Sequence, residues 1–268
     1  MRLQVLIATM QQTDHSLLER MNIQSDAIVG NQCGRNEVER FDYNGHSICY
    51  CSFQERGVGL NRNNAWMRAD AEICLFADDD VRYRDHYAEL ILEEFARHPE
   101  ADLIVFNLDC KNEGRRDYII PKFSKVQWHN SLRYGTYRIA VRTTRARRAN
   151  VCFSLLFGGG ARYGSGEDVI FLNECRKKGL RVYASPLFIG EVTHEESTWF
   201  DGYSEKFFRD KGALFAHLSP ILAKPLCLQL LLRHPDFLSE EIPLKKAYQF
   251  MKQGIREYLG KNPGGESL

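Results

Sequence analysis

The sequence at residues 71–81 is Ala71-Glu72-Ile73-Cys74-Leu75-Phe76-Ala77-Asp78-Asp79-Asp80-Val81, an apolar run that ends abruptly in three carboxylates. Residues 73–77 are apolar at every position, which predicts a short strand buried on both faces. Three adjacent aspartates repel one another, so we expect a cation near them, and Mg²⁺ and Mn²⁺ prefer such oxygen ligands. The carboxyl end of a strand is also where open α/β sheets bind ligands. A solvated loop that caps the following helix is the alternative.

Apolar strands and helical patterns alternate around this stretch. Besides residues 73–77, strands are predicted at 3–8, 26–30, 46–52 and 101–106, and helices at 15–21, 61–69 and 87–98. The order strand, helix, strand implies parallel neighbours joined by right-handed crossovers. Strands and helices that alternate in this way predict an α/β fold with a doubly wound, mostly parallel sheet.

The second half of the chain is less regular at first. Residues 109–149 are rich in basic side chains, and a glycine-dense loop at 157–166 leads into a helix that ends before Gly179. Strands are predicted at 181–184 and 186–192, and most of the remainder is predicted to be helical. We therefore expect a main domain over 1–200 with halves at 1–110 and 111–200, a C-terminal helical extension over 201–260, and a disordered tail at 261–268.

Composition excludes several classes of protein. The 268 residues include 36 Lys and Arg and 35 Asp and Glu, so the net charge of +1 does not indicate a nucleic-acid partner. No signal peptide is recognisable, and no apolar run approaches the roughly 18 residues of a membrane-spanning helix. The eight cysteines form no CxxC pair, so structural zinc is not indicated and we expect a reducing cytoplasm.

Two segments could face a membrane. Arg142, Arg145, Arg147 and Arg148 form a dense basic group, which is either a solvated face or a rim that meets a phosphate-bearing substrate or an anionic membrane. Residues 225–232 are apolar between Lys224 and Arg233. We interpret them as a helix packed on the body of the protein or a surface that touches a membrane.

Four motifs, in this order, resemble those of the family 2 glycosyltransferases with the Rossmann-like GT-A fold, mostly bacterial enzymes of polysaccharide and cell-surface glycan synthesis. Residues 56–65, Arg-Gly-Val-Gly-Leu-Asn-Arg-Asn-Asn-Ala, correspond to the family's Lys-Gly-Leu-Ser-x-Ser-Arg-Asn-x-Ala. Residues 78–80 correspond to its Asp-x-Asp motif, Gly166-Glu167-Asp168 to its Glu-Asp pair, and His194-Glu195-Glu196-Ser197 to its later histidine. The resemblance covers residues 3–200.

The resemblance implies an inverting transferase that moves a sugar from a nucleotide diphosphate sugar, with uridine as the expected base, to a glycan or lipid-linked acceptor. It implies a Mn²⁺ or Mg²⁺ cofactor and a cytoplasmic enzyme that associates peripherally with the inner membrane face. The implied residues are Asp168 and Glu167 for catalysis, Ala8, Thr9, Gln32, Arg62, Asp78 and Asp79 for the nucleotide sugar, and Asp80, Asp78 and His194 for the metal.

Several alternatives stay open. Ser165-Gly166-Glu167-Asp168 matches a capping box, so Asp168 is either a general base or a helix cap. The glycines at 57 and 59 either cradle phosphate or simply begin a helix. Many family members carry an acidic residue after the second strand, where this chain has Asn31-Gln32, so the donor base is less clearly specified. A nucleotidyltransferase and an inactive glycan-binding or partner-binding module are the competing functions.

Overall fold

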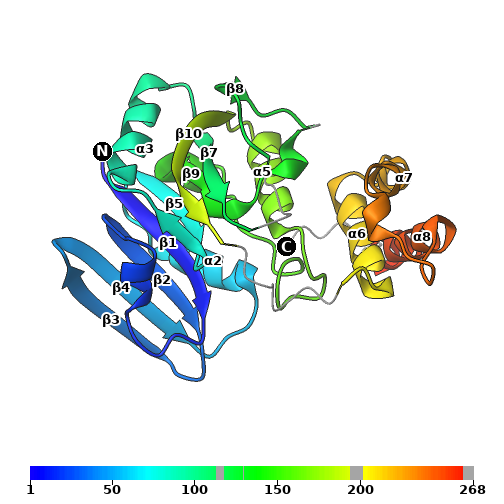
Figure 1. Ribbon diagram of the computed structural model, residues 1–268, viewed down its shortest axis with the longest axis horizontal. Coiled ribbons are helices and arrows are strands. Elements are labelled where there is room, and N and C mark those ends of the chain that lie inside the picture. The colour runs from blue at the N-terminus through cyan, green and yellow to red at the C-terminus, as the bar shows by residue number, and fades with distance from the viewer. Residues whose placement is uncertain (113–117, 129, 194–201, 262–268) are drawn as a thin grey trace. The chain divides into compact units, whose positions relative to one another are not determined.

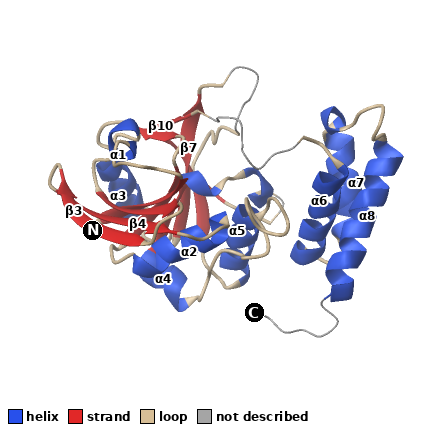
Figure 2. Cartoon of the chain, turned by 90° about the horizontal axis from the view of Figure 1, so that it is seen from below, coloured by secondary structure: helices blue, strands red, loops and turns tan. Residues whose placement is uncertain are grey.

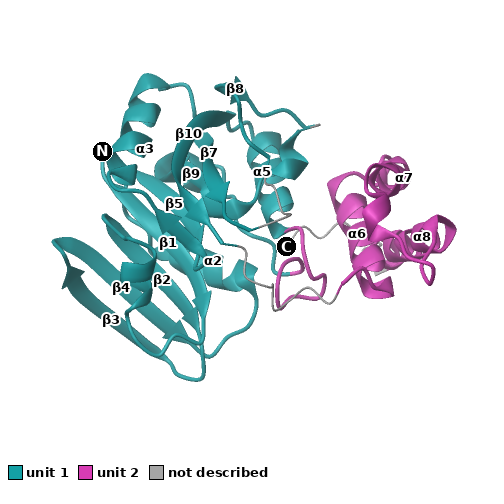
Figure 3. Ribbon diagram, in the orientation of Figure 1, with its two compact units in different colours: residues 1–155, 167–195 teal, residues 156–166, 196–268 magenta. Residues whose placement is uncertain are grey.

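The computed structural model describes residues 1–112, 118–128, 130–193 and 202–261 (Figure 1). The chain divides into two compact units, one of residues 1–155 and 167–195 and one of residues 156–166 and 196–268 (Figure 3). Of the predicted tail at 261–268, Lys261 is the last residue of a helix and residues 262–268 lie outside the described residues, as do His194 and the three residues that follow it in its motif. In the described ranges, no helix is both long and apolar enough to cross a membrane.

The first unit is built on a sheet that has ten strands in the described part of the chain, in the order β3-β4-β2-β1-β5-β9-β7-β10-β6, with β8 paired to β10. The strands are β1 (Leu3–Met10), β2 (Asp26–Gln32), β3 (Glu37–Tyr43), β4 (His46–Phe53), β5 (Ile73–Asp78), β6 (Val81–Tyr83), β7 (Leu103–Cys110), β8 (Ser124–Lys125), β9 (Ile139–Arg142) and β10 (Val182–Val192).

The centre of the sheet is parallel. Strands β4, β2, β1 and β5 pair in parallel, as do β7 and β10. Strand β9 lies between β5 and β7 and runs against both, while β3, β6 and β8 add antiparallel edges. The predicted α/β architecture with a mostly parallel central sheet and a helical C-terminal region is confirmed.

Helices cover both faces of this sheet (Figure 2). One face carries α1 (Leu17–Arg20) and α3 (Tyr87–Arg97), whose buried side chains share one apolar cluster with the sheet. The other face carries α2 (Val58–Arg68), α4 (Thr143–Arg148) and α5 (Glu167–Lys177), which share a second cluster. Short 3-10 turns occur at Ser131–Arg133 and Thr136–Arg138.

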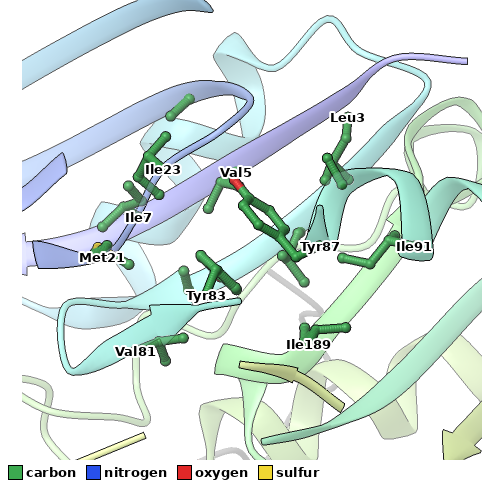
Figure 4. Packing of buried hydrophobic residues seen from close by; sticks show 14 of the residues in the cluster. Leu3, Val5, Ile7, Met21, Ile23, Val81, Tyr83, Tyr87, Ile91 and Ile189 are labelled. Atoms are coloured by element: carbon green, nitrogen blue, oxygen red, sulfur yellow. The ribbon is translucent and has the colours of Figure 1, made fainter. Parts of the chain in front are cut away.

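Strand β1 illustrates how the sequence pattern produces these layers. Leu3, Val5 and Ile7 point into the cluster under α1 and α3 (Figure 4). Leu6, by contrast, belongs to the cluster under α2. Because successive strand residues face opposite sides, a strand between two helical layers must be apolar at nearly every position. Residues 73–77 of β5 obey the same rule, with all five side chains buried.

The second unit consists of α6 (Glu205–Leu218), α7 (Ala223–Arg233), a 3-10 turn at Pro235–Phe237 and α8 (Leu244–Lys261), together with the glycine loop 156–166. Helices α6 and α8 pack closely because two glycines face the partner backbone. A Cβ atom on Gly212 would lie 2.0 Å from the Met251 carbonyl oxygen, and one on Gly254 would lie 1.9 Å from the Arg209 carbonyl oxygen.

Four strands of the described sheet were not predicted: β3, the short strands β6 and β8, and β9. Strand β9 lies in the stretch expected to be irregular, because its apolar core is only Ile139-Ala140-Val141, between two arginines. Strand β3 is largely polar, since it forms one edge of the sheet. The turn between β3 and β4 is Asn44-Gly45, with φ of 53° and 82°. This dipeptide favours the two-residue hairpin turn and was the available signal for β3.

Candidate active site

The acidic triplet lies at the carboxyl end of β5, beside the end of β1. Asp78 is the last residue of β5 and stands in register with Ala8 of the parallel strand β1. The Thr9 hydroxyl donates a hydrogen bond to Asp79 Oδ2 at 2.5 Å. The parallel pairing therefore brings together four residues that sequence motifs assigned to the nucleotide sugar, from two segments about 70 residues apart.

Asp79 is exposed at the surface, but the protein around its carboxylate removes part of its hydration. Burial raises the pKa of Asp79, and repulsion from Asp78 raises it further, while the hydrogen bond from Thr9 opposes both effects. Burial disfavours an ionised carboxylate because the charge loses its hydration. This side of the site therefore favours a cation, which would offset the repulsion between the two neighbouring aspartates.

One buried arginine joins the end of β5 to the start of α5. Arg62 of α2 donates from Nη2 to Asp78 Oδ1 at 2.6 Å and from Nη1 to Glu167 Oε1 at 2.8 Å. Its side chain is 5% exposed. Burial alone would lower the pKa of Arg62, but attraction to Asp78, Glu167 and Asp168 outweighs that effect and raises it. The guanidinium is thus permanently charged and committed to protein carboxylates.

Helix α5 begins with the Glu-Asp pair, as predicted. Glu167 is its first residue and Asp168 its second, and Gly166 before them has a φ of 115°, which a residue with a side chain rarely adopts. The Val169 N–H donates to Asp168 Oδ1 at 2.7 Å, so this carboxylate satisfies one of the free backbone donors of the first turn. The capping contact and a catalytic role are compatible, because one hydrogen bond uses only part of the acceptor capacity of a carboxylate.

The glycine-containing turn before α2 has a packing role. A Cβ atom on Gly59 would lie 2.2 Å from the Ser154 carbonyl oxygen, so the chain at 153–154 can approach the helix only because residue 59 is glycine. Asn63 fixes the same segment by accepting from the Phe153 N–H at 2.8 Å and donating to its carbonyl at 2.9 Å. The turn therefore holds a loop of this chain, and Gly59 gives no sign of a phosphate cradle.

Asn31 and Gln32 hold neighbouring loops. Asn31 accepts from the Gln12 N–H at 3.0 Å and donates to the Gln12 carbonyl at 3.0 Å, and it also donates to Ser52. Gln32 Nε2 donates to the Gly57 carbonyl at 2.9 Å. Both side chains are almost fully buried. Their side-chain amides therefore hold the loops beside the site in place. The acidic residue that the family pattern has after the second strand is replaced here by these two amides.

The end of β5 and the start of α5 carry oxygen ligands of the kind that divalent ions prefer. Asp78, Glu167 and Asp168 lie near the buried cation Arg62, and Asp79 lies close enough to Asp78 to be repelled by it. The Thr193 N–H donates to the Asp80 carbonyl at 3.1 Å, so the chain leaves β10 next to the triplet. Among the described residues, no three His, Cys, Asp or Glu side chains form a metal-binding group, and the predicted ligand His194 lies outside them.

A surface cavity that the sequence did not predict lies at the edge formed by β6 and β10. It has a volume of about 940 Å³ and begins at Arg82, two residues after the acidic triplet. Its lining is mainly charged, with one exposed aromatic ring from Phe188. Four segments form it, at Asn22 and around residues 82–86, 109 and 188–191. Because these segments are far apart in sequence, no local pattern could have indicated it.

The basic group at 142–148 is partly structural. Arg142 donates from Nε to the Ala101 carbonyl and from Nη2 to the Phe95 carbonyl, each at 2.8 Å. Arg147 donates to carbonyl groups at the end of α2, including that of Trp66 at 2.8 Å. Two of the four arginines therefore bind backbone oxygens and do not form a uniform rim for phosphate or a membrane.

Comparison with known proteins agrees with the motifs and the fold. Residues 33–157 match the family model described as glycosyl transferase family 2. No curated protein matches the chain. Among solved structures, residues 1–349 of S. aureus TarS match with a TM-score of 0.63 and 14% identity, over 99% of this chain and 92% of that one. The same TarS fragment in complex with UDP-GlcNAc matches with a TM-score of 0.64 and 15% identity, over 99% and 93%.

At this level of identity the TarS structures establish the fold, and the family model describes residues 33–157, a little less than half of the chain. The matched range contains two of the four motifs, residues 56–65 with Arg62 and the three aspartates at 78–80. The match over residues 33–157 and the GT-A fold both agree with the resemblance to the family 2 glycosyltransferases and support a glycosyltransferase.

Proposed function

We propose that the protein transfers a sugar from a uridine diphosphate sugar to an acceptor hydroxyl, with inversion at the anomeric carbon and with a divalent metal. The observation that carries this proposal is the double contact of Arg62 with Asp78 and Glu167. It links the carboxylates at the end of β5, which suit the leaving-group side, to the start of α5, where Asp168 suits the acceptor side. A one-step displacement needs these two sides on opposite flanks of the reacting carbon.

Asp168 is our candidate for the general base, and Glu167 is its neighbour in the predicted catalytic pair. A carboxylate that takes the proton from the acceptor hydroxyl makes the oxygen a better nucleophile. Asp80, with Asp78 and His194, is our candidate set for Mn²⁺ or Mg²⁺, which would neutralise charge on the departing diphosphate as a Lewis acid. The contact of Thr193 with Asp80 supports this set, because His194 is the next residue in the chain.

The nucleotide side is proposed to involve Ala8, Thr9, Gln32, Asp78 and Asp79. UDP-GlcNAc and UDP are bound in two of the TarS structures that share this fold, which supports uridine as the base here. Asn31 and Gln32 are occupied with neighbouring backbone groups, so we expect them to act by shaping the pocket. Thr9 and the backbone near it are then the groups best placed to contact the nucleoside.

The proposed acceptor is a hydroxyl of a glycan or of a lipid-linked sugar, reached at the cytoplasmic face of a membrane. Helix α7 supports this location, because Ile221 just before it and Leu232 within it are 89% and 64% exposed. Leu228 lies between them at helical spacing and is also exposed. Lys224 and Arg233 flank these side chains, and such a basic, apolar surface favours anionic lipid.

Equilibrium binding tests the donor assignment. In the presence of Mn²⁺, UDP should raise the melting temperature of the protein and bind at least tenfold more tightly than GDP, ADP or CMP, because a ligand that binds only the folded state stabilises it. A preference for another nucleotide would overturn the uridine assignment. Failure of every nucleotide and nucleotide sugar to bind would overturn the transferase proposal itself.

Flotation with vesicles tests the location. Binding to vesicles that contain anionic lipid at low salt is expected for the intact chain and should weaken when Ile221 and Leu232 are both replaced by Ser. Arg148→Ser, which removes an exposed arginine from α4, is the matched control for a loss of charge alone. Equal flotation of the parent protein and the Ile221, Leu232 double variant would show that α7 is not the membrane contact.

A further inference from the structure

We propose that Glu167 and Arg62 are positioning residues, and that together with Asp78 they form a bridge that sets the place of Asp168 relative to the acidic triplet. This inference rests on the proposed function, since it assigns Asp168 as the base. The three residues of the Arg62 bridge (Asp78, Arg62 and Glu167) come from the end of β5, the middle of α2 and the first position of α5.

Both terminal nitrogens of the Arg62 guanidinium are occupied by protein carboxylates, and its Nε is buried away from solvent. Its two terminal nitrogens bind two different carboxylates at 2.6 and 2.8 Å, and Phe153 lies 5.6 Å from its central carbon. With 5% of the Arg62 side chain exposed, a diphosphate cannot reach it without displacing one of these groups. The diphosphate contact that the family motif implied for Arg62 is therefore replaced in our proposal by an internal ion pair.

Glu167 is similarly committed. Its side chain is 13% exposed, and Oε1 accepts from Arg62. The buried guanidinium of Arg62 engages this carboxylate at hydrogen-bond distance, and removal of either partner would leave the other charge buried and unpaired. Glu167 therefore suits a structural role better than a second catalytic one, although it is adjacent to Asp168 in the sequence.

The Arg62 bridge explains how the first turn of α5 keeps the Asp168 carboxylate in a fixed position. Gly166, directly before α5, has the unusual φ of 115°, so backbone geometry alone permits more freedom there than at an ordinary residue. The Glu167–Arg62–Asp78 contacts tie the first residue of α5 to the end of a central strand. Because reactions between bound groups lose about 100-fold when a group is misplaced by about 1 Å, such a tie has a direct effect on turnover.

Substitutions at Glu167 separate positioning from catalysis. Glu167→Ala removes the bridge, and we expect kcat to fall by about 10- to 100-fold while the Kd for UDP stays within about threefold, because the donor is not contacted. Glu167→Gln keeps an oxygen that can accept from Arg62, and kcat should stay within about threefold of the parent value. Glu174→Gln, a loss of charge farther along the same helix at a surface ion pair with Lys177, is the matched control and should leave kcat unchanged.

A cycle with Arg62 tests whether the bridge acts as one unit. Arg62→Lys replaces the rigid guanidinium fork, whose two separate nitrogens reach Asp78 and Glu167, with one compact ammonium, so it should lower kcat to a similar extent as Glu167→Ala. The double variant Arg62→Lys, Glu167→Ala should be no slower than the slower single variant, because residues that act together are not additive.

Different outcomes overturn different claims. A kcat of Glu167→Ala equal to that of the parent would refute the bridge. A loss in Glu167→Gln as large as in Glu167→Ala would show that the charge of Glu167 acts in the chemistry itself. If the parent protein turns over no nucleotide sugar, or if Asp168→Asn is fully active, the proposed function or its base is wrong.

If the protein has no measurable activity, amide hydrogen exchange still tests the Arg62 bridge. Glu167→Ala should exchange faster than the parent in the first turn of α5, at residues 169–171, with no change in α3. Unchanged protection at residues 169–171 would refute the bridge independently of any activity.

Discussion

Replacement of Asp168 by Asn distinguishes a general base from a helix cap. Asn keeps an oxygen that can accept from the Val169 N–H, which now donates to Asp168 Oδ1 at 2.7 Å. Asn also caps helices about as well as Asp. The change removes only the negative charge, whose interaction with the helix N-terminus is worth about 0.3–1 kcal/mol. We therefore expect the free energy of unfolding to fall by no more than about 1 kcal/mol.

The expected effect on turnover is far larger. Proton removal by a placed carboxylate contributes about 10²- to 10⁴-fold, which corresponds to about 2.7–5.4 kcal/mol of activation free energy at 1.36 kcal/mol for each factor of ten. The kcat of Asp168→Asn should therefore fall by far more than its small loss of stability can explain. Steady-state release of the nucleoside diphosphate and a separate titration of UDP binding measure the two quantities, and the Kd for UDP should be nearly unchanged.

The same experiment addresses stereochemistry. A single displacement that uses one carboxylate as base inverts the anomeric centre, so an α-linked donor should give a β-linked product. The anomeric proton of the product, observed by NMR, reports this directly. Retained configuration would exclude the one-step mechanism. Full activity of Asp168→Asn would instead show that Asp168 acts as a helix cap and not as the base. Glu174→Gln on the same helix controls for any general effect of removing a charge.

Three further outcomes are expected. Asp80→Ala should abolish turnover while the protein stays folded by circular dichroism, and excess EDTA should do the same to the parent, so full activity in EDTA would exclude the proposed metal. Gly254→Ala should lower the stability of the helical unit by about 1–3 kcal/mol, since the added carbon would lie 1.9 Å from the Arg209 carbonyl oxygen; Gly260→Ala, in open space on the same helix, is the control for a change in its melting transition. Arg147→Ala should destabilise the main unit by about 1–3 kcal/mol through the carbonyl groups it leaves unbound, and a loss of vesicle binding without a loss of stability would contradict its structural assignment.

The sequence by itself determined the central layers of the protein. Runs such as residues 3–8 and 73–77 are apolar on both faces, and only a strand covered by helices on two sides buries such a run completely. The amphipathic pattern of α3 indicates where that helix lies, and the glycine after α5 indicates where that helix ends. Both signals are local in the sequence. The acidic triplet could be placed at the end of β5 for the same reason, because the change from apolar to charged residues occurs within one strand.

The tertiary structure decided which side chains meet. Arg62 and Glu167 are 105 residues apart, and nothing near either residue indicates that they form an ion pair. The unit to which the glycine loop at 156–166 belongs is another example. The Gly164 N–H donates to Asp210 of α6 at 2.8 Å, and Phe157 stacks on Tyr163 within the loop. Residues 156–166 therefore pack with the helical unit. Local periodicity reports how a segment divides its polar and apolar faces. It carries no information about which distant segment covers a given face or which distant side chain pairs with a buried charge. Those contacts form only when the chain is folded.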